Sequence, residues 1–129
     1  MTDPIGDMLA RIKNAYLAKK PVVFCAASNA KTAVCEILKA EGKISDFEKV
    51  KKNNATDLKS VLNYKNGEPV VTDVRRISKP GRRIYIASQD LRKYVKNIKI
   101  GIISTSSGMM SARTARKNNM GGEFICEIW

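Results

Sequence analysis

Four hydroxyl side chains followed by a glycine stand together in the stretch Ser104–Gly108, which has the sequence Ser-Thr-Ser-Ser-Gly. Hydroxyls both donate and accept hydrogen bonds, and glycine allows close approach to the backbone. This combination suits phosphate and sugar oxygens, or the edge of an unstacked base. Clusters of Ser and Gly are more often plain loops than binding sites, so the surroundings must decide.

The elements around this stretch predict where it lies. An apolar run, Ile98 to Ile103, precedes it and predicts a strand. Ser111 follows and is a good cap for a short helix that carries Arg113, Arg116 and Lys117. We therefore expect the hydroxyl-rich stretch at a strand-to-helix corner.

The charge of the chain favours a polyanionic partner. The 129 residues include 24 Lys and Arg against 12 Asp and Glu, for a formal net charge of +12. Residues 1–70 hold 12 basic and 8 acidic side chains, whereas residues 71–129 hold 12 and 4. A solubilising surface would also be basic, but the uneven distribution favours a polyanion face in the second half.

Metal, cofactor and membrane functions find no support in the sequence. Histidine is absent, and the spacing of Cys25, Cys35 and Cys126 is unlike that of a zinc site. Three cysteines among apolar neighbours indicate reduced core residues of a cytoplasmic protein. Asp3 and Asp7 precede every basic residue and no apolar signal-peptide core follows them, so we expect no signal peptide. The longest apolar runs are far shorter than a membrane span, so we expect no membrane partner, and we expect no cofactor.

The first half of the chain predicts the order α-β-α-β-β. Asp3 can cap a helix that begins at Pro4 and carries one apolar stripe, and Ser28 or Asn29 can cap a second helix. A turn over residues 65–69 suggests a boundary, so we predict an N-terminal α/β domain over 1–66. The predicted strands of this half span Val22–Cys25, Ile44–Lys51 and Asp57–Tyr64.

The second half, residues 67–129, predicts a β-rich RNA-binding domain with short helices, in an α+β protein of two small domains. Strands are expected over Val70–Ile77 and Ile84–Ile86, joined through a Pro80-Gly81 turn of type II. A final strand should place Phe124, Cys126 and Ile128 on one face, and bring Glu123 close to the hydroxyl-rich stretch.

Basic side chains surround one aromatic residue in this half. Nine basic residues lie between Arg75 and Lys99 against a single acid, Asp90, and Tyr85 stands among them. Cations neutralise phosphates and an aromatic ring stacks on bases, so the pattern is typical of nucleic-acid binding, although Tyr85 fits a core position equally well. The candidate RNA-binding residues are Lys79, Arg82, Arg83, Tyr85, Ser104, Thr105, Ser106, Ser107, Gly108 and Glu123.

Several of these segments together resemble the bacterial small-subunit ribosomal protein S8 family over essentially the whole chain. The matching segments are Thr2–Ile5, Asp7–Leu9, Arg11-Ile12, Ile37–Lys39, Glu41-Gly42, Arg76–Gly81 with Arg83 and Tyr85, Ser104–Ser106 with Gly108, and Gly121–Glu123 with Cys126 and Trp129. This sequence departs from the common family pattern at Ala26, Asn29, Ser107 and Glu127, the last standing where an aromatic residue is frequent.

The resemblance implies a structural protein that binds an irregular stem in the central domain of small-subunit ribosomal RNA and aids subunit assembly. It also implies repression of translation through a similar stem in the protein's own messenger RNA, and contacts with neighbouring small-subunit proteins. Most RNA contacts would come from the C-terminal domain. At matching positions they would be made by Ser104, Thr105, Ser106 and Gly108, supported by Tyr85, Lys79 and Glu123.

Two other functions remain to be weighed. A general RNA- or DNA-binding module would also explain the charge, but it would bind scrambled RNA and duplex DNA as well as any cognate stem. A serine hydrolase would need an activated nucleophile, and no Gly-X-Ser-X-Gly elbow is present. We therefore predict that the protein is not an enzyme.

Overall fold

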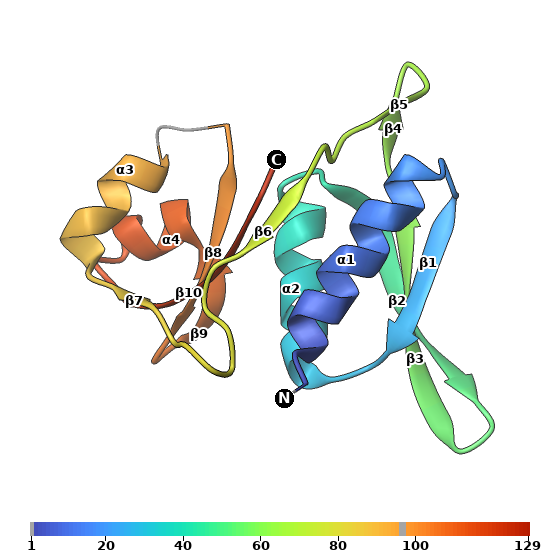
Figure 1. The fold of residues 1–129 in the computed structure, drawn as a ribbon, viewed down its shortest axis with the longest axis horizontal. Helices are drawn as coiled ribbons and strands as arrows, with labels where there is room; N and C mark the ends of the chain where they lie inside the picture. The colour runs from blue at the N-terminus through green and yellow to red at the C-terminus, as the bar shows by residue number, and fades with distance from the viewer. Residues whose placement is uncertain (1, 96–97) are drawn as a thin grey trace. The chain divides into compact units, whose positions relative to one another are not determined.

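The computed structural model describes residues 2–95 and 98–129, which form two compact units (Figure 1). The first unit is Pro4–Thr72, and the second comprises Asp73–Trp129 with Met1–Asp3. The predicted fold class is confirmed, because the first unit combines helices with antiparallel strands and the second is mainly β with short helices. The division predicted between residues 66 and 67 stays a prediction.

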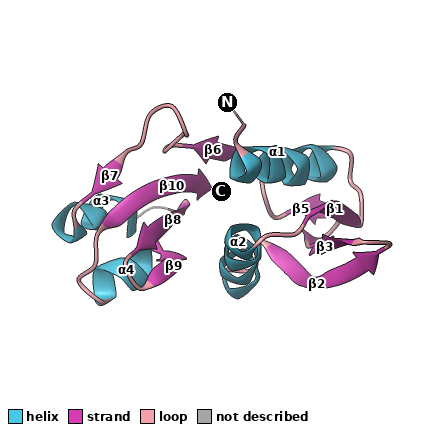
Figure 2. Ribbon diagram, turned by 90° about the horizontal axis from the view of Figure 1, so that it is seen from below, coloured by secondary structure: helices cyan, strands magenta, loops and turns pink. Residues whose placement is uncertain are grey.

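The first unit packs two helices against a three-stranded antiparallel sheet (Figure 2). The middle strand, β3, pairs with β1 on one side and β2 on the other. Its Leu58 is fully buried, as are Leu9 of α1 and Val34 of α2, so the apolar stripes predicted for both helices form the core. The elements are α1 (Pro4–Leu17), β1 (Val22–Ala26), α2 (Asn29–Ala40), β2 (Ile44–Lys52) and β3 (Ala55–Leu62).

Local signals place the ends of these helices. The Ser28 hydroxyl accepts a hydrogen bond from the Lys31 backbone N–H at 3.2 Å and caps α2, so Ser28 is the cap of the two residues predicted for it. The Asp3 carboxylate binds Arg76, with Oδ2 at 3.1 Å from Nε. The acid chosen as a helix cap therefore also serves an ion pair with a residue far along the chain.

The segment that follows β3 is less regular than predicted. A short hairpin, β4 (Tyr64–Lys65) with β5 (Glu68–Pro69), occupies the expected turn. The strand predicted over Val70–Ile77 is restricted to β6 (Val74–Arg76). Val71 is buried but lies outside any strand. This part of the apolar run therefore contributes side chains to the core without pairing in the sheet.

The second unit is built on a five-stranded sheet in which β10 lies between β8 on one side and both β6 and β7 on the other. The final strand is therefore inside the sheet, as predicted. Leu91, Ile103, Ala115 and Phe124 form the core of this unit. The remaining elements are β7 (Tyr85–Ile86), η1 (Ser88–Leu91), α3 (Arg92–Val95), β8 (Ile100–Thr105), β9 (Gly108–Ser111), α4 (Ala112–Lys117) and β10 (Gly122–Ile128).

The alternation predicted for β10 is wrong because the strand contains a bulge. Phe124 pairs with Ile103, but Cys126 pairs with Ile102, so one residue of β10 is extra. The extra residue shifts the alternation, and Phe124 lines the same cavity as Glu127 rather than sharing a face with Cys126.

Two turns also differ from expectation. Ser104–Gly108 is not a strand-to-helix corner but the tip of the β8–β9 hairpin, since Met109 and Met110 continue as a strand paired with Ser104 and Ile103. Gly81 does not adopt the positive φ that a type II turn requires, so the turn type predicted for Pro80-Gly81 is wrong. Ser111 caps α4 as predicted, accepting from the Thr114 N–H.

Candidate nucleic-acid interface

The tip of the β8–β9 hairpin is shaped by the hydroxyl of Thr105. This hydroxyl donates to the Gly108 carbonyl at 2.7 Å and accepts from the Ser107 N–H at 3.1 Å. Gly108 has a φ of 107°, a conformation that favours glycine. Thr105 therefore mainly stabilises the turn, because its hydroxyl hydrogen is already donated to the Gly108 carbonyl.

The serines of the tip remain available to a ligand. Ser106 and Ser107 are exposed and Ser104 is half-buried. Within the described residues, the side chains of these three serines make no hydrogen bond to the protein. Each can therefore donate and accept toward phosphate, sugar or base atoms without breaking an internal bond.

Three candidate residues form a row across neighbouring strands. Glu123 of β10 pairs with Tyr85 of β7 on one side and with Ser104 of β8 on the other. The expected proximity of Glu123 to the hydroxyl-rich stretch is confirmed. Tyr85 is 71% exposed, which removes the core alternative and leaves its ring open to stacking.

The Glu123 carboxylate binds side chains of the basic loop, residues 78–84, which leads into β7. Its Oε2 accepts from the Ser78 hydroxyl and from Arg83 Nη1, the latter at 2.9 Å. Burial would raise the pKa of Glu123, but the bonds from Ser78 and Arg83 outweigh it and lower the pKa below its ordinary value. The side chain is therefore an anion with Oε1 left to accept from a base amino group.

Ser78 is a supporting residue that sequence reasoning did not identify. It is fully buried, and its hydroxyl also accepts from the Ile84 N–H at 3.1 Å. One hydroxyl thus joins the two ends of the basic loop to β10. Its membership in the matching segment Arg76–Gly81 was the available signal, but a lone serine beside a turn predicts no such role.

The basic loop itself presents two exposed cations. Lys79 and Arg82 exchange backbone hydrogen bonds of 3.0 and 2.9 Å, which close the loop and leave both side chains at the surface. Arg83 is half-exposed and tied to Glu123, so it serves the loop as well as a ligand. Lys96, one of the nine basic residues of this region, lies outside the described residues.

Two glycines allow the row of strands to come together. A Cβ on Gly122 would lie 2.1 Å from the Ser104 carbonyl oxygen, and one on Gly121 would lie 2.5 Å from that of Ile86. Both approaches are shorter than any real Cβ contact, so β10 requires glycine where it enters the site.

Other ligand classes are not supported by the described part of the chain. There, no three His, Cys, Asp or Glu side chains gather as metal ligands do. Among the described helices none has the length and apolar character needed to cross a membrane. Burial raises the pKa of Cys126 to about 12 and that of Cys35 to about 11, which makes both thiols poor nucleophiles.

Comparison with known proteins places the chain among ribosomal proteins, as its sequence motifs predicted. The family model described as "Ribosomal protein S8" matches residues 3–129. Small ribosomal subunit protein uS8 from Lactococcus lactis subsp. lactis (strain IL1403) is 47% identical over 130 residues, which cover 100% of this chain and 98% of the relative. The proteins of the same name from Lactobacillus helveticus and Mesorhizobium japonicum are 46% and 42% identical, with the same coverage.

Proposed function

The chain belongs to the ribosomal protein S8 family and is a protein of the small ribosomal subunit, and from this premise we propose that it binds an irregular stem in the central domain of small-subunit ribosomal RNA. The observation that carries the proposal is the row of Tyr85, Glu123 and Ser104 beside the hairpin tip. The family is structural rather than enzymatic, and its members work on the cytoplasmic ribosome with ribosomal RNA and other ribosomal proteins as partners.

In the proposed mechanism, one set of residues supplies affinity for any RNA and another recognises the irregular stem. Lys79 and Arg82 neutralise phosphates, which gives binding that depends on salt and little on sequence. The hydroxyls of Ser104, Ser106 and Ser107 meet sugar and base edges. Tyr85 offers its exposed ring to an unstacked base, and Glu123 Oε1 accepts from a base amino group.

The shape of RNA explains why the stem should be irregular. Regular A-form RNA has a deep, narrow major groove that side chains cannot read. A bulged stem exposes base edges and unstacked bases at one place. The site is short and combines hydroxyls, one ring and one carboxylate, so it suits such a local irregularity better than a long regular helix.

A titration tests this mechanism. Purified protein is titrated with the central-domain stem of its own organism and with a base-scrambled stem of equal length, at several salt concentrations. Ser106→Ala should weaken binding of the cognate stem alone, by about 1–3 kcal/mol if the hydroxyl meets a base edge. Arg82→Ala should weaken both RNAs alike and reduce the salt dependence. Equal losses on both RNAs from Ser106→Ala would contradict the recognition half of the proposal.

The same titration separates the rival function. A general RNA- or DNA-binding module would bind the scrambled stem and duplex DNA as tightly as the cognate stem at the same salt concentration. Retention of tight binding by the cognate stem alone, as salt rises, would support a dedicated RNA site. Loss of that difference would favour the general module.

We further propose that binding assists assembly of the small subunit, and that a similar stem in the protein's own messenger RNA binds the same site and represses translation. A cell-free translation reaction programmed with that messenger RNA tests the second part. Added protein should lower translation of the natural message, and Ser106→Ala should lower it less. Free ribosomal stem should relieve the repression by competition, because both RNAs would use one site.

A further inference from the structure

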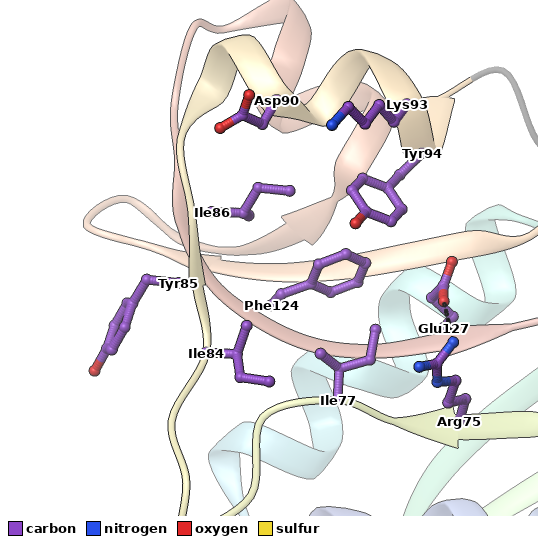
Figure 3. A pocket seen from close by; sticks show the side chains of 10 residues that line it. All are labelled: Arg75, Ile77, Ile84, Tyr85, Ile86, Asp90, Lys93, Tyr94, Phe124 and Glu127. Atoms are coloured by element: carbon purple, nitrogen blue, oxygen red, sulfur yellow. Dashed lines mark ion pairs between the residues drawn. The ribbon is translucent and has the colours of Figure 1, made fainter.

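The second unit contains a cavity of about 420 Å³ that borders the proposed RNA site only at Tyr85. Its walls include Ile77, Ile86 and Phe124, which give it an apolar floor. The Tyr85 ring points away from it, whereas neighbouring Ile86 points inward (Figure 3). Because side chains alternate along β7, the cavity and the exposed ring lie on opposite faces of that strand.

A buried carboxylate stands at one end of this cavity. The Glu127 side chain is only 7% exposed, and in the described part of the chain no hydrogen bond reaches it. Among the described residues its only ion pair is with Arg75, whose Nη1 lies 4.0 Å from Oε1 (Figure 3). Arg75 is itself 68% exposed, so it does not fill the cavity. No side-chain oxygen of the described residues is both fully buried and without a hydrogen bond, so the Glu127 carboxylate must reach solvent, and its oxygens can still accept from a ligand.

Two aromatic rings stand near the carboxylate. Tyr94 of α3 and Phe124 of β10 meet edge to face, with ring centroids 4.8 Å apart and planes at 88°. Figure 3 shows both rings on the same side of Glu127. A ring face attracts a cation, and a carboxylate accepts two parallel N–H bonds from a guanidinium.

We propose that this cavity receives an arginine side chain of a neighbouring protein. The aliphatic part of the arginine packs on Ile77 and Ile86, and the guanidinium reaches the Glu127 carboxylate beside the Tyr94 and Phe124 rings. The incoming group replaces Arg75 as the partner of Glu127. Arg75 then turns to solvent, where most of its side chain already lies.

The charges around the cavity favour a protein partner over RNA. Glu127 and Asp90 both line it and would repel phosphates, while the nearby cations Arg75 and Lys93 only balance them. The exposed cations Lys79 and Arg82 of the basic loop do not line it. An arginine side chain can pack its methylene groups on the apolar floor and place its guanidinium against the Glu127 carboxylate.

A pair of peptides that differ in one charge tests the proposal on the full chain. The probes are acetyl-Gly-Arg-Gly-amide and the same peptide with citrulline, which has nearly the shape of arginine without its charge. Binding is followed by amide chemical shifts in two-dimensional NMR. We expect the arginine peptide to shift the amide signals of Tyr94, Phe124 and Glu127. The citrulline peptide should bind at least about tenfold more weakly.

Two variants sharpen the result. Glu127→Gln keeps the size of the side chain and should weaken the arginine peptide about tenfold, with binding of the cognate RNA stem unchanged. Arg75→Ala removes the internal competitor and should leave peptide binding equal or tighter. RNA binding is measured on the same variants. A variant that loses peptide binding but keeps RNA binding tests the arginine site alone and leaves the RNA proposal untouched.

The proposal is overturned if arginine and citrulline peptides bind alike, or if the shifts fall outside the cavity. Preferential binding of guanosine at these residues would also overturn it, because the cavity would then be a base pocket. The comparison of the two peptides needs no substitution, so it decides the question even if Glu127→Gln does not fold.

Discussion

Ser78 shows how much of the second unit depends on one hydroxyl. It donates to Glu123, accepts from the Ile84 N–H and is fully buried. Ser78→Ala would leave the Ile84 N–H and the carboxylate without this partner. We expect the free energy of unfolding to fall by about 1–3 kcal/mol, measured by urea denaturation.

A matched control for this substitution is available in the hairpin tip. Ser106→Ala removes an exposed hydroxyl that makes no hydrogen bond to the described protein, so the free energy of unfolding should change by less than about 0.5 kcal/mol. A loss of equal size in both variants would mean that the buried hydroxyl contributes nothing special to stability.

The lowered pKa of Glu123 predicts an acid-sensitive contribution to stability. The folded protein holds this carboxylate as an anion to lower pH than the unfolded chain does. Its stabilising effect is therefore complete above the ordinary pKa of 4.5 and disappears as pH falls through the lower pKa of the folded state. Urea denaturation between neutral and acidic pH should show a steeper loss of stability for the natural protein than for Glu123→Gln. Parallel pH profiles would contradict this.

Strand β10 is the element on which the site depends most. It lies between β7 and β8, and Gly122 lets it approach the Ser104 carbonyl. Gly122→Ala would place a methyl group 2.1 Å from that oxygen, so the strands must separate. We expect a loss of about 1–3 kcal/mol or more in thermal or urea unfolding, and weaker binding of the cognate stem.

Gly81→Ala is the appropriate comparison for this element. Gly81 has no positive φ, and apart from the glycine and its two chain neighbours no heavy atom lies within 4 Å of the Cβ it would acquire. This variant should unfold like the natural protein. If Gly122→Ala behaved in the same way, close strand approach would not be a requirement of the site.

At the scale of the whole molecule, the prediction concerns which unit supplies the phosphate contacts. Replacing Lys79 and Arg82 with glutamine should reduce the slope of log affinity against log salt by about 1.4–1.8, if each contacts one phosphate. Lys49 and Lys51 lie exposed on β2 of the first unit and form a matched pair of cations. Their replacement with glutamine should leave the slope nearly unchanged, because we interpret them as a solvated face. Equal slopes for both double variants would contradict this assignment.

Local signals in the sequence were sufficient for several elements. The stripe of α1 and the caps Ser28 and Ser111 were predicted correctly because capping and apolar periodicity depend on residues within one or two turns. The inner position of β10 and its proximity to the hydroxyl-rich stretch were also predicted. Family membership followed from several motifs in the expected order.

The sequence by itself therefore determined the fold class, the basic second half and the residues that deserve testing. Only the tertiary structure decided that Ser104–Gly108 is a hairpin tip, that β10 carries a bulge, and that Glu123 binds Ser78 and Arg83. It also placed Glu127 in the wall of a cavity with an apolar floor. These features depend on strand register and on contacts between residues far apart in the chain, and periodicity within one segment does not encode which distant backbone will stand beside it.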